Sequence, residues 1–426
     1  MRPLRIAFHG EPVRPNVPSS ANSLGVPVIP AGLEIVSRNF VVSRAVVTVA
    51  TGHFAVDFAA LGPAMLYPIL AVRLDMSYSM IGFAALAWAV TTAVFQPFFG
   101  YVGDRFGRRW FAAVSPVWIA VWVALAAFSS SYGALVLCLV VAALGIAVFH
   151  PQGAAIANEA PGHNTGVNVA LFFLGGHAAF AVGPLIYGVV LERGGTGWMP
   201  MVLAPILFVS VFMGWSLGRF QFPTVSPSRV DISQYVAGGT VAAVIGLLVV
   251  SVVRGWAYAS LTTFIPVFVS PDRPDPIRAG VVLAAYLTGH AIAAFAGGVF
   301  TDRVSIGRML GYSSIVMIPS MLAFGLLPFG PWHIFLGALV GASVGVGFTP
   351  VVVMVQRLLP DRMGAASGIV LGASFGAGAA GNFVTGLVAD VAGLNIAIAG
   401  MALAQIVVIA ALPWMPRLAS RSLTAK

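Results

Sequence analysis

The stretch that decides the fold runs from Ser77 to Ser129 and reads SYSMIGFAALAWAVTTAVFQPFFGYVGDRFGRRWFAAVSPVWIAVWVALAAFS. It contains two apolar runs, residues 77–100 and 110–129, on either side of a short charged loop. Each run has the roughly 17–25 residues that an α-helix needs to cross the hydrocarbon core of a bilayer. The stretch therefore predicts two transmembrane helices joined by a tight loop.

The composition of the whole chain indicates the same class. Of its 426 residues, 59% are hydrophobic and only 8% are charged, whereas a soluble domain carries roughly 25% charged residues. Too few charged side chains are present to cover a water-exposed surface, so the outer surface is expected to face lipid. The single cysteine, Cys138, excludes an internal disulfide and a cysteine metal site.

Twelve apolar runs of transmembrane length follow one another along the chain, which predicts an all-α integral membrane protein. They lie at residues 44–71, 77–100, 110–129, 133–157, 166–191, 198–217, 235–269, 279–300, 309–328, 331–356, 364–389 and 394–414. The polar, proline-rich residues 1–42 lack the apolar segment of a cleaved signal peptide. We expect them to form a disordered cytosolic tail.

The basic residues are distributed unequally between the two sides of this predicted arrangement. With the N-terminus in the cytosol, 17 of the 22 Lys and Arg residues fall on the cytosolic side, four fall on the other side and Arg254 lies within a span. Because cytosolic loops carry an excess of Lys and Arg, both termini are expected in the cytosol. The net charge of +9 reflects this bias, and no nucleic-acid partner is expected.

An internal repeat divides the chain into two halves. The matching residues, 198 or 199 positions apart, are Gly100, Asp104 and Arg105 with Gly298, Asp302 and Arg303; Gly166, Gly183 and Gly188 with Gly364, Gly381 and Gly386; and Phe149 and Pro151 with Phe348 and Pro350. We expect six-helix halves at 43–217 and 235–414, a cytosolic linker at 218–234 and a cytosolic tail at 415–426. Such halves insert in the same orientation, related by an axis along the membrane normal.

The charged loop GYVGDRFGRR resembles the signature loop of the major facilitator superfamily, G-x-x-x-D-R-x-G-R-R. The matching residues are Gly100, Asp104, Arg105, Gly107, Arg108 and Arg109. The resemblance implies a loop that fixes the cytosolic helix ends and helps to hold the outward-facing state, with Asp104 able to pair with an Arg across the halves. A degenerate second copy keeps Asp302, Arg303, Gly307 and Arg308, with Asp and Gly five instead of three positions apart. The alternative is an ordinary positively charged cytosolic loop.

Three longer segments resemble the fosmidomycin-resistance branch of that superfamily. They are GHFAVDFAALGPAMLYPIL at 52–70, FHPQGAAIAN at 149–158 and QRLLPDRMGAASGIVLGASFGAGAAGNFVTGLVAD at 356–390. The resemblance implies proton-driven efflux of small, often anionic or amphiphilic compounds such as drugs. The identity of the substrate does not carry over.

Asp57 is the only one of the 13 acidic residues that lies well inside a predicted span. A charged side chain at mid-bilayer costs about 2.5–3.5 kcal/mol on insertion scales, so it is expected to face a cavity or a partner. His53 precedes Asp57 by about one helical turn and projects from the same helix face. Because burial disfavours the charged form of both groups, the pair suits a proton carrier. The alternative is a hydrogen bond that only packs helices.

Arg254 is the only basic residue well inside a predicted span, the seventh. The repeat relates this span to the first, which carries Asp57. Arg254 is therefore expected either to bind an anionic substrate or to serve as the counter-ion of Asp57. The alternative is an arginine whose side chain reaches to the membrane surface.

Other polar residues in the spans are candidates for the transport path: His150, His177, His290 and Gln96. The alternative for each of them is a packing or hydrogen-bonding role, which is the more common one for a polar residue in a membrane helix. No metal site is expected, because the histidines are widely separated along the chain and no acidic or cysteine cluster accompanies them.

The chain contains neither the phosphate-binding motif GxxxxGK[ST] nor the zinc-protease motif HExxH. We expect no enzyme activity, no cofactor and no direct use of ATP. The expected function is a monomeric secondary transporter in the bacterial cytoplasmic (inner) membrane, surrounded by lipid, that exchanges protons for a small-molecule substrate. The alternatives are proton-coupled uptake of a metabolite and a membrane sensor on the same fold that binds a ligand without moving it.

Overall fold

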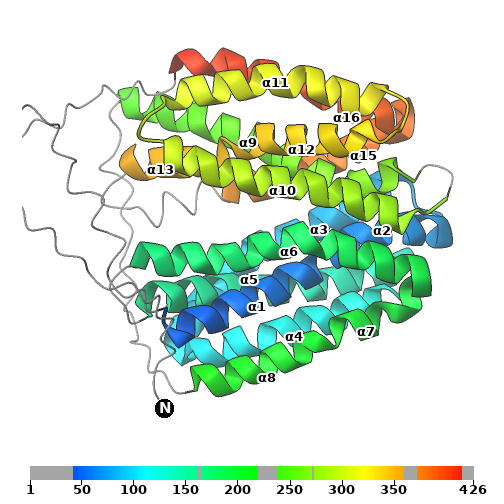
Figure 1. The fold of residues 1–426 in the computed structure, drawn as a ribbon, viewed down its shortest axis with the longest axis vertical. Helices are drawn as coiled ribbons and strands as arrows, with labels where there is room; N and C mark the ends of the chain where they lie inside the picture. Colours follow the sequence, from blue (N-terminus) through cyan, green and yellow to red (C-terminus); the bar gives the residue numbers. More distant parts are fainter. Residues whose placement is uncertain (1–41, 161–164, 219–237, 271–272, 359–371, 415–426) are drawn as a thin grey trace, which may run out of the picture.

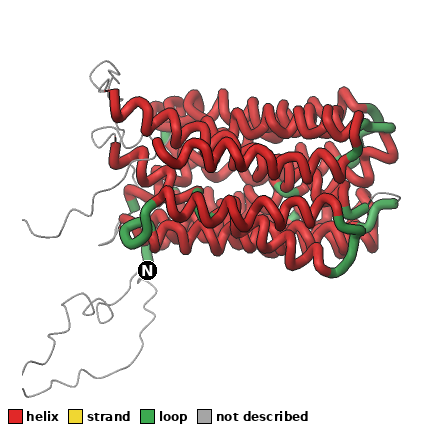
Figure 2. Tube along the Cα trace, turned by 90° about the horizontal axis from the view of Figure 1, so that it is seen from above, coloured by secondary structure: helices red, strands yellow, loops and turns green. Residues whose placement is uncertain are grey.

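The computed structural model describes residues 42–160, 165–218, 238–270, 273–358 and 372–414. Within them the chain is built of helices that lie lengthwise beside one another, with the loops gathered at the two ends (Figure 2). The all-helical class predicted from the sequence is confirmed. Apart from residues 42 and 218, the expected tails at 1–42 and 415–426 and the expected linker at 218–234 lie outside the described residues.

The helices form two bundles, one from each half of the chain (Figure 1). The N-terminal bundle consists of α1 (Arg44–Ala60), α2 (Gly62–Leu74), α3 (Tyr78–Phe106), α4 (Arg108–Ala126), α5 (Tyr132–Glu159), α6 (Thr165–Gly194), η2 (Gly195–Trp198), α7 (Met199–Leu203) and α8 (Pro205–Leu217). The C-terminal bundle consists of α9 (Gly238–Phe268), α10 (Pro276–Phe300), α11 (Ile306–Leu326), α12 (Trp332–Gly345), α13 (Phe348–Leu358), η5 (Ala373–Ala377), α15 (Gly378–Ala392), α16 (Leu394–Ala411) and η6 (Leu412–Trp414). We call the end at which α3 turns into α4 the loop end, and the opposite end, where α6 ends and α10 begins, the far end.

Eleven helical runs of the described residues are long and apolar enough to cross a membrane. One of them, Thr165–Leu217, has 53 residues, far more than the about 20 residues of a single crossing. It comprises α6, the turn η2, α7 and α8, and the chain reverses its direction between α6 and α8 (Figure 1). The chain is therefore a multi-pass membrane protein.

Large apolar side chains are exposed on both bundles. Phe208 and Phe295 are each 75% exposed, and Val391 is 91% exposed. In water, an apolar surface of this extent would promote aggregation. A lipid environment accommodates such a surface, which agrees with the low content of charged residues.

Among the described residues, three of the predicted spans are interrupted, each just before a proline; the sixth breaks at Ala204, between α7 and α8, before Pro205. The first breaks at Leu61, between α1 and α2, where Pro63 lacks the N–H that would bond the Ala59 carbonyl. The tenth breaks at residues 346–347, between α12 and α13, where Pro350 likewise cannot bond the carbonyl of Val346. Hydropathy alone registers each pair of helices as one run, because a proline changes the backbone bonding without lowering the apolar content.

The two bundles meet closely along α6 and α10, and along α3 and α15. At the far end, a methyl group on Gly280 of α10 would overlap the carbonyl oxygen of Pro184 on α6, and one on Gly188 would overlap that of Pro276. Small residues allow such backbone-to-backbone approach between membrane helices. In Figure 1 the bundles converge at this end, whereas α13 and the beginning of α6 lie further apart at the loop end. We call this glycine-lined contact the far-end seam.

A carboxylate completes the contact at the far end. Asp390, near the end of α15, accepts hydrogen bonds from the backbone N–H groups of Tyr78 (2.7 Å) and Ser79 (3.1 Å). The first N–H groups of a helix have no acceptor within that helix, and Asp390 supplies one for the start of α3. The helix dipole also favours a negative charge at this position. A side chain of the C-terminal bundle thus caps a helix of the N-terminal bundle.

Candidate functional site

Two helices of the N-terminal bundle bring a carboxyl group and two imidazoles together. Within α1, Asp57 Oδ2 lies 3.2 Å from His53 Nε2, and Asp57 Oδ1 lies 3.5 Å from His150 Nε2 on α5. His53 and Asp57 are buried, whereas the side chain of His150 is 24% exposed. The sequence placed His150 in the transport path without a partner, and the structure adds it to the expected pair. We call His53, Asp57 and His150 the Asp57 cluster.

Backbone carbonyls fix the tautomers of both histidines. His53 Nδ1 lies 2.8 Å from the carbonyl oxygen of Phe172 on α6, and His150 Nδ1 lies 3.1 Å from that of Ile146. A carbonyl oxygen can only accept, so Nδ1 carries the hydrogen and donates it in both rings. The other nitrogen of each ring, Nε2, therefore points to Asp57.

Helix α6 closes the inner side of the Asp57 cluster. The ring of His53 stacks on Phe172, with centroids 4.2 Å apart. Gly176, one turn further along α6, lies so close that an added methyl group would meet Asp57 Oδ2 at 2.5 Å. Any larger residue there would force the carboxyl group out of its position between the two imidazoles.

The same three side chains are ligands that transition metals accept. Their ligand atoms all lie within 4.8 Å of one another, and imidazoles whose Nδ1–H donates to a carbonyl are typical of metal sites. The sequence argument against a metal rested on the wide separation of the histidines along the chain. The fold removes that separation for His53 and His150.

His177 and His290 lie on opposite bundles. His177, on α6, donates its Nδ1–H to the carbonyl oxygen of Phe173 (2.9 Å) and interacts electrostatically with His53 and Asp57. His290, on α10, interacts electrostatically with His177, and its ring lies 4.7 Å from the ring of Tyr258 on α9. These groups extend from the Asp57 cluster toward the C-terminal bundle. The fourth candidate, Gln96, is half-buried on α3.

The structure does not bring Arg254 to Asp57. The guanidinium, buried within the C-terminal bundle, donates to the carbonyl oxygens of Ser343 (2.5 Å) and Val344 (3.3 Å), just before the break between α12 and α13. It also donates to a hydroxyl and a carbonyl of α11, those of Ser313 (2.6 Å) and Leu310 (3.4 Å). Its Nε–H is buried without a hydrogen-bond partner among the described residues.

An ion network ties the signature loop together within the N-terminal bundle. Arg108, at the start of α4, donates to Asp104 of α3 at 2.6 and 2.9 Å and to Glu159 of α5 at 2.5 Å. In this conformation Asp104 therefore pairs inside its own bundle, and not across the halves. Arg105 contacts the Tyr101 hydroxyl, at 3.2 Å.

The remaining residues of the two copies lie at the loop end. Arg109 donates to the carbonyl of Gly218 (3.3 Å), and Gly107, with φ of 99°, makes the turn between α3 and α4. In the second copy Asp302 pairs with Arg357 of α13 (2.5 Å), Arg308 donates to the Ser305 hydroxyl (3.1 Å), and Arg303 and Gly307 lie between these residues in the chain.

Sequence reasoning missed Glu159 and Arg357, the partners of the two signature copies. Glu159 is the last residue of α5, and Arg357 is the last residue but one of α13. These helices correspond in the repeat through Phe149 and Phe348. The repeat thus places a charged residue at the end of both helices, and this correspondence could have indicated the two partners.

Two segments of the C-terminal bundle match the esterase pattern G-x-S-x-G: residues 341–345 and 372–376. Esterases place that serine on a sharp turn between a strand and a helix. Ser343 lies within α12 and donates to the carbonyl of Leu339 (2.8 Å), and Ser374 lies within a helical turn. Neither has the setting of a nucleophile.

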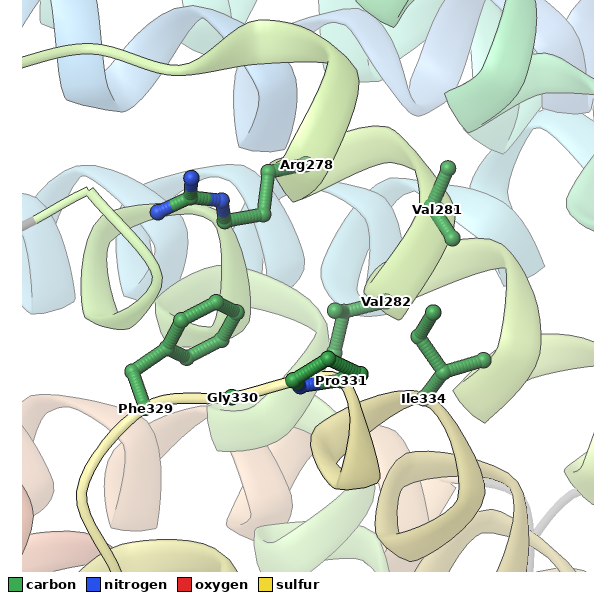
Figure 3. A pocket seen from close by; sticks show the side chains of 7 residues that line it. All are labelled: Arg278, Val281, Val282, Phe329, Gly330, Pro331 and Ile334. Carbon is green, nitrogen blue, oxygen red and sulfur yellow. The ribbon is translucent and has the colours of Figure 1, made fainter.

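A surface cavity of about 460 Å³ lies at the far end of the C-terminal bundle (Figure 3). The beginning of α10 and the α11–α12 connection form its walls, which consist of Arg278, Val281, Val282, Phe329, Gly330, Pro331 and Ile334. Arg278 lies over the Phe329 ring, 5.2 Å from its centroid. None of the candidate residues from the sequence lines this cavity.

Comparison with known proteins agrees with these features. The model of the Major Facilitator Superfamily matches residues 47–382. The fosmidomycin resistance protein of Escherichia coli is 26% identical over 332 residues, covering 76% of this chain and 81% of that protein. The uncharacterized MFS-type transporter YfnC of Bacillus subtilis is 26% identical over 350 residues, covering 78% and 83%.

Solved structures share the arrangement of helices. A bacterial homolog of the human lysosomal transporter Spinster superposes with a TM-score of 0.72 at 14% identity, covering 87% of this chain and 96% of that chain. The nucleoside transporter NupG superposes with a TM-score of 0.69 at 15% identity, covering 87% and 98%. Since the family model covers most of the sequence and the fold agrees, the chain belongs to the major facilitator superfamily of membrane transporters.

Proposed function

We propose that this transporter exports a small amphiphilic or anionic compound in exchange for protons. The observation that carries the proposal is Asp57, a buried carboxyl group held between two imidazoles. Buried carboxyl and imidazole groups in membrane helices mark proton pathways in pumps and transporters. Export is supported by the relative that confers resistance to fosmidomycin, since resistance is the expected outcome of drug removal.

The proposed topology has twelve transmembrane helices in two six-helix halves. The run Thr165–Leu217 crosses twice, since its 53 residues contain α6, a turn at η2 and α8. Together with the other helical runs this makes the expected twelve. The excess of basic residues at the loop end supports a cytosolic location for that end and for both termini. The membrane is the bacterial inner membrane, and the transporter acts as a monomer.

The proposed cycle is a rocking of the two bundles about the central site. The bundles touch closely at the far end through the far-end seam and the cap of Asp390. With the loop end in the cytosol, this conformation is closed to the outside. The outward-facing state then requires the far-end contacts to separate and the ends of the signature loops to approach each other.

The proposed substrate path runs between His150 and His177 of the N-terminal bundle and His290 of the C-terminal bundle. Gln96 and the unpartnered Nε–H of Arg254 are further donors along it. Protonated imidazoles attract an anion, and the rings of Tyr258 and Phe348 near His290 offer apolar contact. This mixture supports an amphiphilic anion as the substrate.

Flux into proteoliposomes with an imposed pH gradient tests the proposal, with fosmidomycin as the first probe. Wild-type protein is expected to accumulate the probe in the direction opposite to the proton gradient. Asp57→Asn keeps the size and a hydrogen-bonding group but cannot release a proton. It is expected to bind and exchange the probe without accumulating it. Gradient-driven transport at the wild-type level by Asp57→Asn would refute the role of Asp57.

A further inference from the structure

The Asp57 cluster turns three electron-pair donors toward one place. The Nδ1–H of each histidine donates to a backbone carbonyl, so the nitrogen that faces Asp57 is Nε2 in both rings. In a neutral imidazole this Nε2 carries a lone pair, as the carboxylate oxygens of Asp57 also do. A cation placed among the three groups would bind all of them.

The spacing of the ligand atoms agrees with a single metal ion. His53 Nε2 lies 3.2 Å from Asp57 Oδ2, and His150 Nε2 lies 3.5 Å from Asp57 Oδ1. With metal–ligand bonds of about 2.0–2.1 Å, two ligand atoms of a tetrahedral site lie about 3.3–3.4 Å apart. The contact of His150 is longer than an N–H···O hydrogen bond of roughly 2.7–3.2 Å, but it is close to one edge of that tetrahedron.

The glycine at position 176 of α6 leaves room beside two of the ligand atoms. A methyl group added to Gly176 would lie 2.5 Å from Asp57 Oδ2 and 2.8 Å from His53 Nε2. Any side chain at this position would therefore fill the place next to both atoms, and glycine keeps that place free. The stacking of Phe172 on His53 also holds the imidazole in its orientation.

The charge of Asp57 is not compensated by an arginine. Two guanidinium groups are buried in the described part of the chain, those of Arg108 and Arg254. Arg108 pairs with two other carboxylates, and Arg254 is bound within the C-terminal bundle. Buried charges in proteins are paired or coordinate metals. A bound cation would supply the positive charge that neither arginine brings to Asp57.

We propose that the Asp57 cluster binds one divalent transition-metal ion, such as Zn²⁺, through His53 Nε2, His150 Nε2 and the carboxylate of Asp57. Imidazole suits zinc, nickel and copper, whereas Ca²⁺ and Mg²⁺ take oxygen ligands. A carbonyl that accepts the other N–H of the ring is the usual outer partner of a histidine ligand. Three protein ligands leave the fourth position of a tetrahedral ion open, and water takes it. The inference goes beyond the proposed function and does not depend on it.

Titration of the full-length protein with Zn²⁺ tests the proposal. The protein is purified in detergent without a histidine tag, stripped of metal and titrated in a calorimeter, and the wild type is expected to bind one ion per chain. His53→Gln, His150→Gln and Asp57→Asn each remove one ligand. Each is expected to weaken binding by more than the roughly 10- to 100-fold that loss of an outer partner costs. Unchanged affinity in any of the three would indicate an adventitious ion only and overturn the proposal.

His177→Gln is the matched control for His150→Gln. His177 also donates its Nδ1–H to a carbonyl of its own helix (2.9 Å), but it is not one of the three ligands. This variant is expected to bind zinc as the wild type does. Gly176→Ala keeps all three ligands, fills the place beside them and is expected to lose zinc. Equal losses in His177→Gln and His150→Gln, or wild-type binding by Gly176→Ala, would contradict the site.

Electron paramagnetic resonance of the wild-type protein with bound Cu²⁺ identifies the ligands without any variant. The result therefore does not depend on whether the variants fold. Because Cu²⁺ also binds imidazole, the spectrum is expected to show coupling to the nitrogens of two imidazoles. Coupling to one imidazole, or to none, would refute the assignment of His53 and His150 to one ion.

The metal site and the proposed function can fail separately. If the protein binds zinc at these residues but shows no proton-driven transport, the proposed function fails and the metal site stands. If transport is driven by protons and the wild type binds no zinc, the inference of a metal site fails and the proposed function stands.

Discussion

At the scale of single residues, the buried Arg254 donates five hydrogen bonds within the part of the chain that the structure describes, and none of them goes to a carboxylate. All of its described bonds go to carbonyl oxygens and hydroxyls of α11 and α12. The carbonyls of Ser343 and Val344 precede a helix break, where the usual backbone donors are missing. The planar guanidinium reaches several of these acceptors at once. Arg254 therefore stabilises the break in addition to any role toward an anion.

Arg254→Lys separates these two roles, because it keeps the positive charge and loses the planar fork. We expect it to lower the apparent melting temperature in detergent, with a loss on the order of 2 kcal/mol from the unmade bonds. Arg254→Gln, which lacks the charge as well, is expected to bind anionic probes more weakly than Arg254→Lys. Equal melting temperatures for wild type and Arg254→Lys would contradict the stabilising role.

From the sequence, contacts between side chains could be predicted only for residues of the same helix. His53 and Asp57 were paired correctly because four positions place them on one helical face. His150 could not be joined to them, since the packing of α5 against α1 fixes that contact. For the same reason the sequence could not decide against Asp57 as a partner of Arg254, which was one of the two roles considered for it. Nothing in its local sequence indicates that the nearest acceptors are backbone groups of a broken helix.

At the scale of elements, ion pairs at the signature loop connect α3, α4 and α5. Arg108 is the only buried charge in it, and two carboxylates share that charge. The side chain of Asp104 is 38% exposed, so its pairing is partly screened by solvent. Of the two carboxylates, Asp104 is therefore the one that can separate from Arg108 when the two bundles approach each other at the loop end.

Asp104→Asn is expected to leave the protein folded and to slow cycling. The substitution removes the charge of Asp104, and the weakened pairing with Arg108 is expected to lower the free energy of unfolding by about 1 kcal/mol. Transport rate and protein yield, measured together, separate cycling from folding. The matched control is Asp302→Asn, since Asp302 is 75% exposed and its pair with Arg357 contributes less. Equal effects of both substitutions would contradict a special role for the first copy.

Asp390→Asn is expected to loosen the far end. The amide can accept only one of the two bonds that the carboxylate accepts from α3, and the favourable charge at the helix start is lost. We expect a shift toward the outward-open state by about 1 kcal/mol, or roughly fivefold. Distances between spin labels at Val72 and Leu327 would report the shift.

Asp275→Asn is the matched control for Asp390→Asn. Asp275 caps α10 by accepting from the N–H of Arg278 (3.0 Å), so this bond stays within one bundle. It is expected to leave the label distances unchanged. A similar shift in both variants would mean that the loss of any cap loosens the protein.

At the scale of the whole molecule, composition was enough to predict the class of fold. A chain with 8% charged residues has few ways to avoid aggregation other than immersion in lipid. The repeat suggested two halves, and the structure has a bundle from each half. The first and tenth spans were expected as possible split spans, but the positions of the breaks before Pro63 and Pro350 were not predicted, and neither was the closeness of the bundles at the far end. That closeness depends on which glycines face each other, which no single segment reveals.

Cysteine labelling tests the double crossing of the Thr165–Leu217 run. In a Cys138→Ala background, an impermeant reagent on intact cells is expected to label Arg193→Cys but neither Thr165→Cys nor Gly218→Cys. All three positions are exposed in the structure. Labelling of one end of the run but not of the other would indicate a single crossing and an odd number of spans.

A larger residue at Gly280 is expected to force the bundles apart at the far end. Gly280→Leu places a side chain where the backbone of α6 lies, so the outward-open state should gain population in the same spin-label measurement. Gly400→Leu is the matched control, because nothing lies within 4 Å of the added atom there. No change of the label distances in Gly280→Leu would show that α10 and α6 yield locally.

The far-end seam also bears on how the cycle responds to temperature. When side chains interlock, opening a contact frees their rotamers, and this entropy gain weights the open state more heavily as temperature rises. Glycine has no side chain to free, and its close backbone contacts hide little apolar surface, so the heat-capacity change on opening is small. The ratio of the two states should therefore change little with temperature, and warming should quicken the cycle without altering which side is open more of the time.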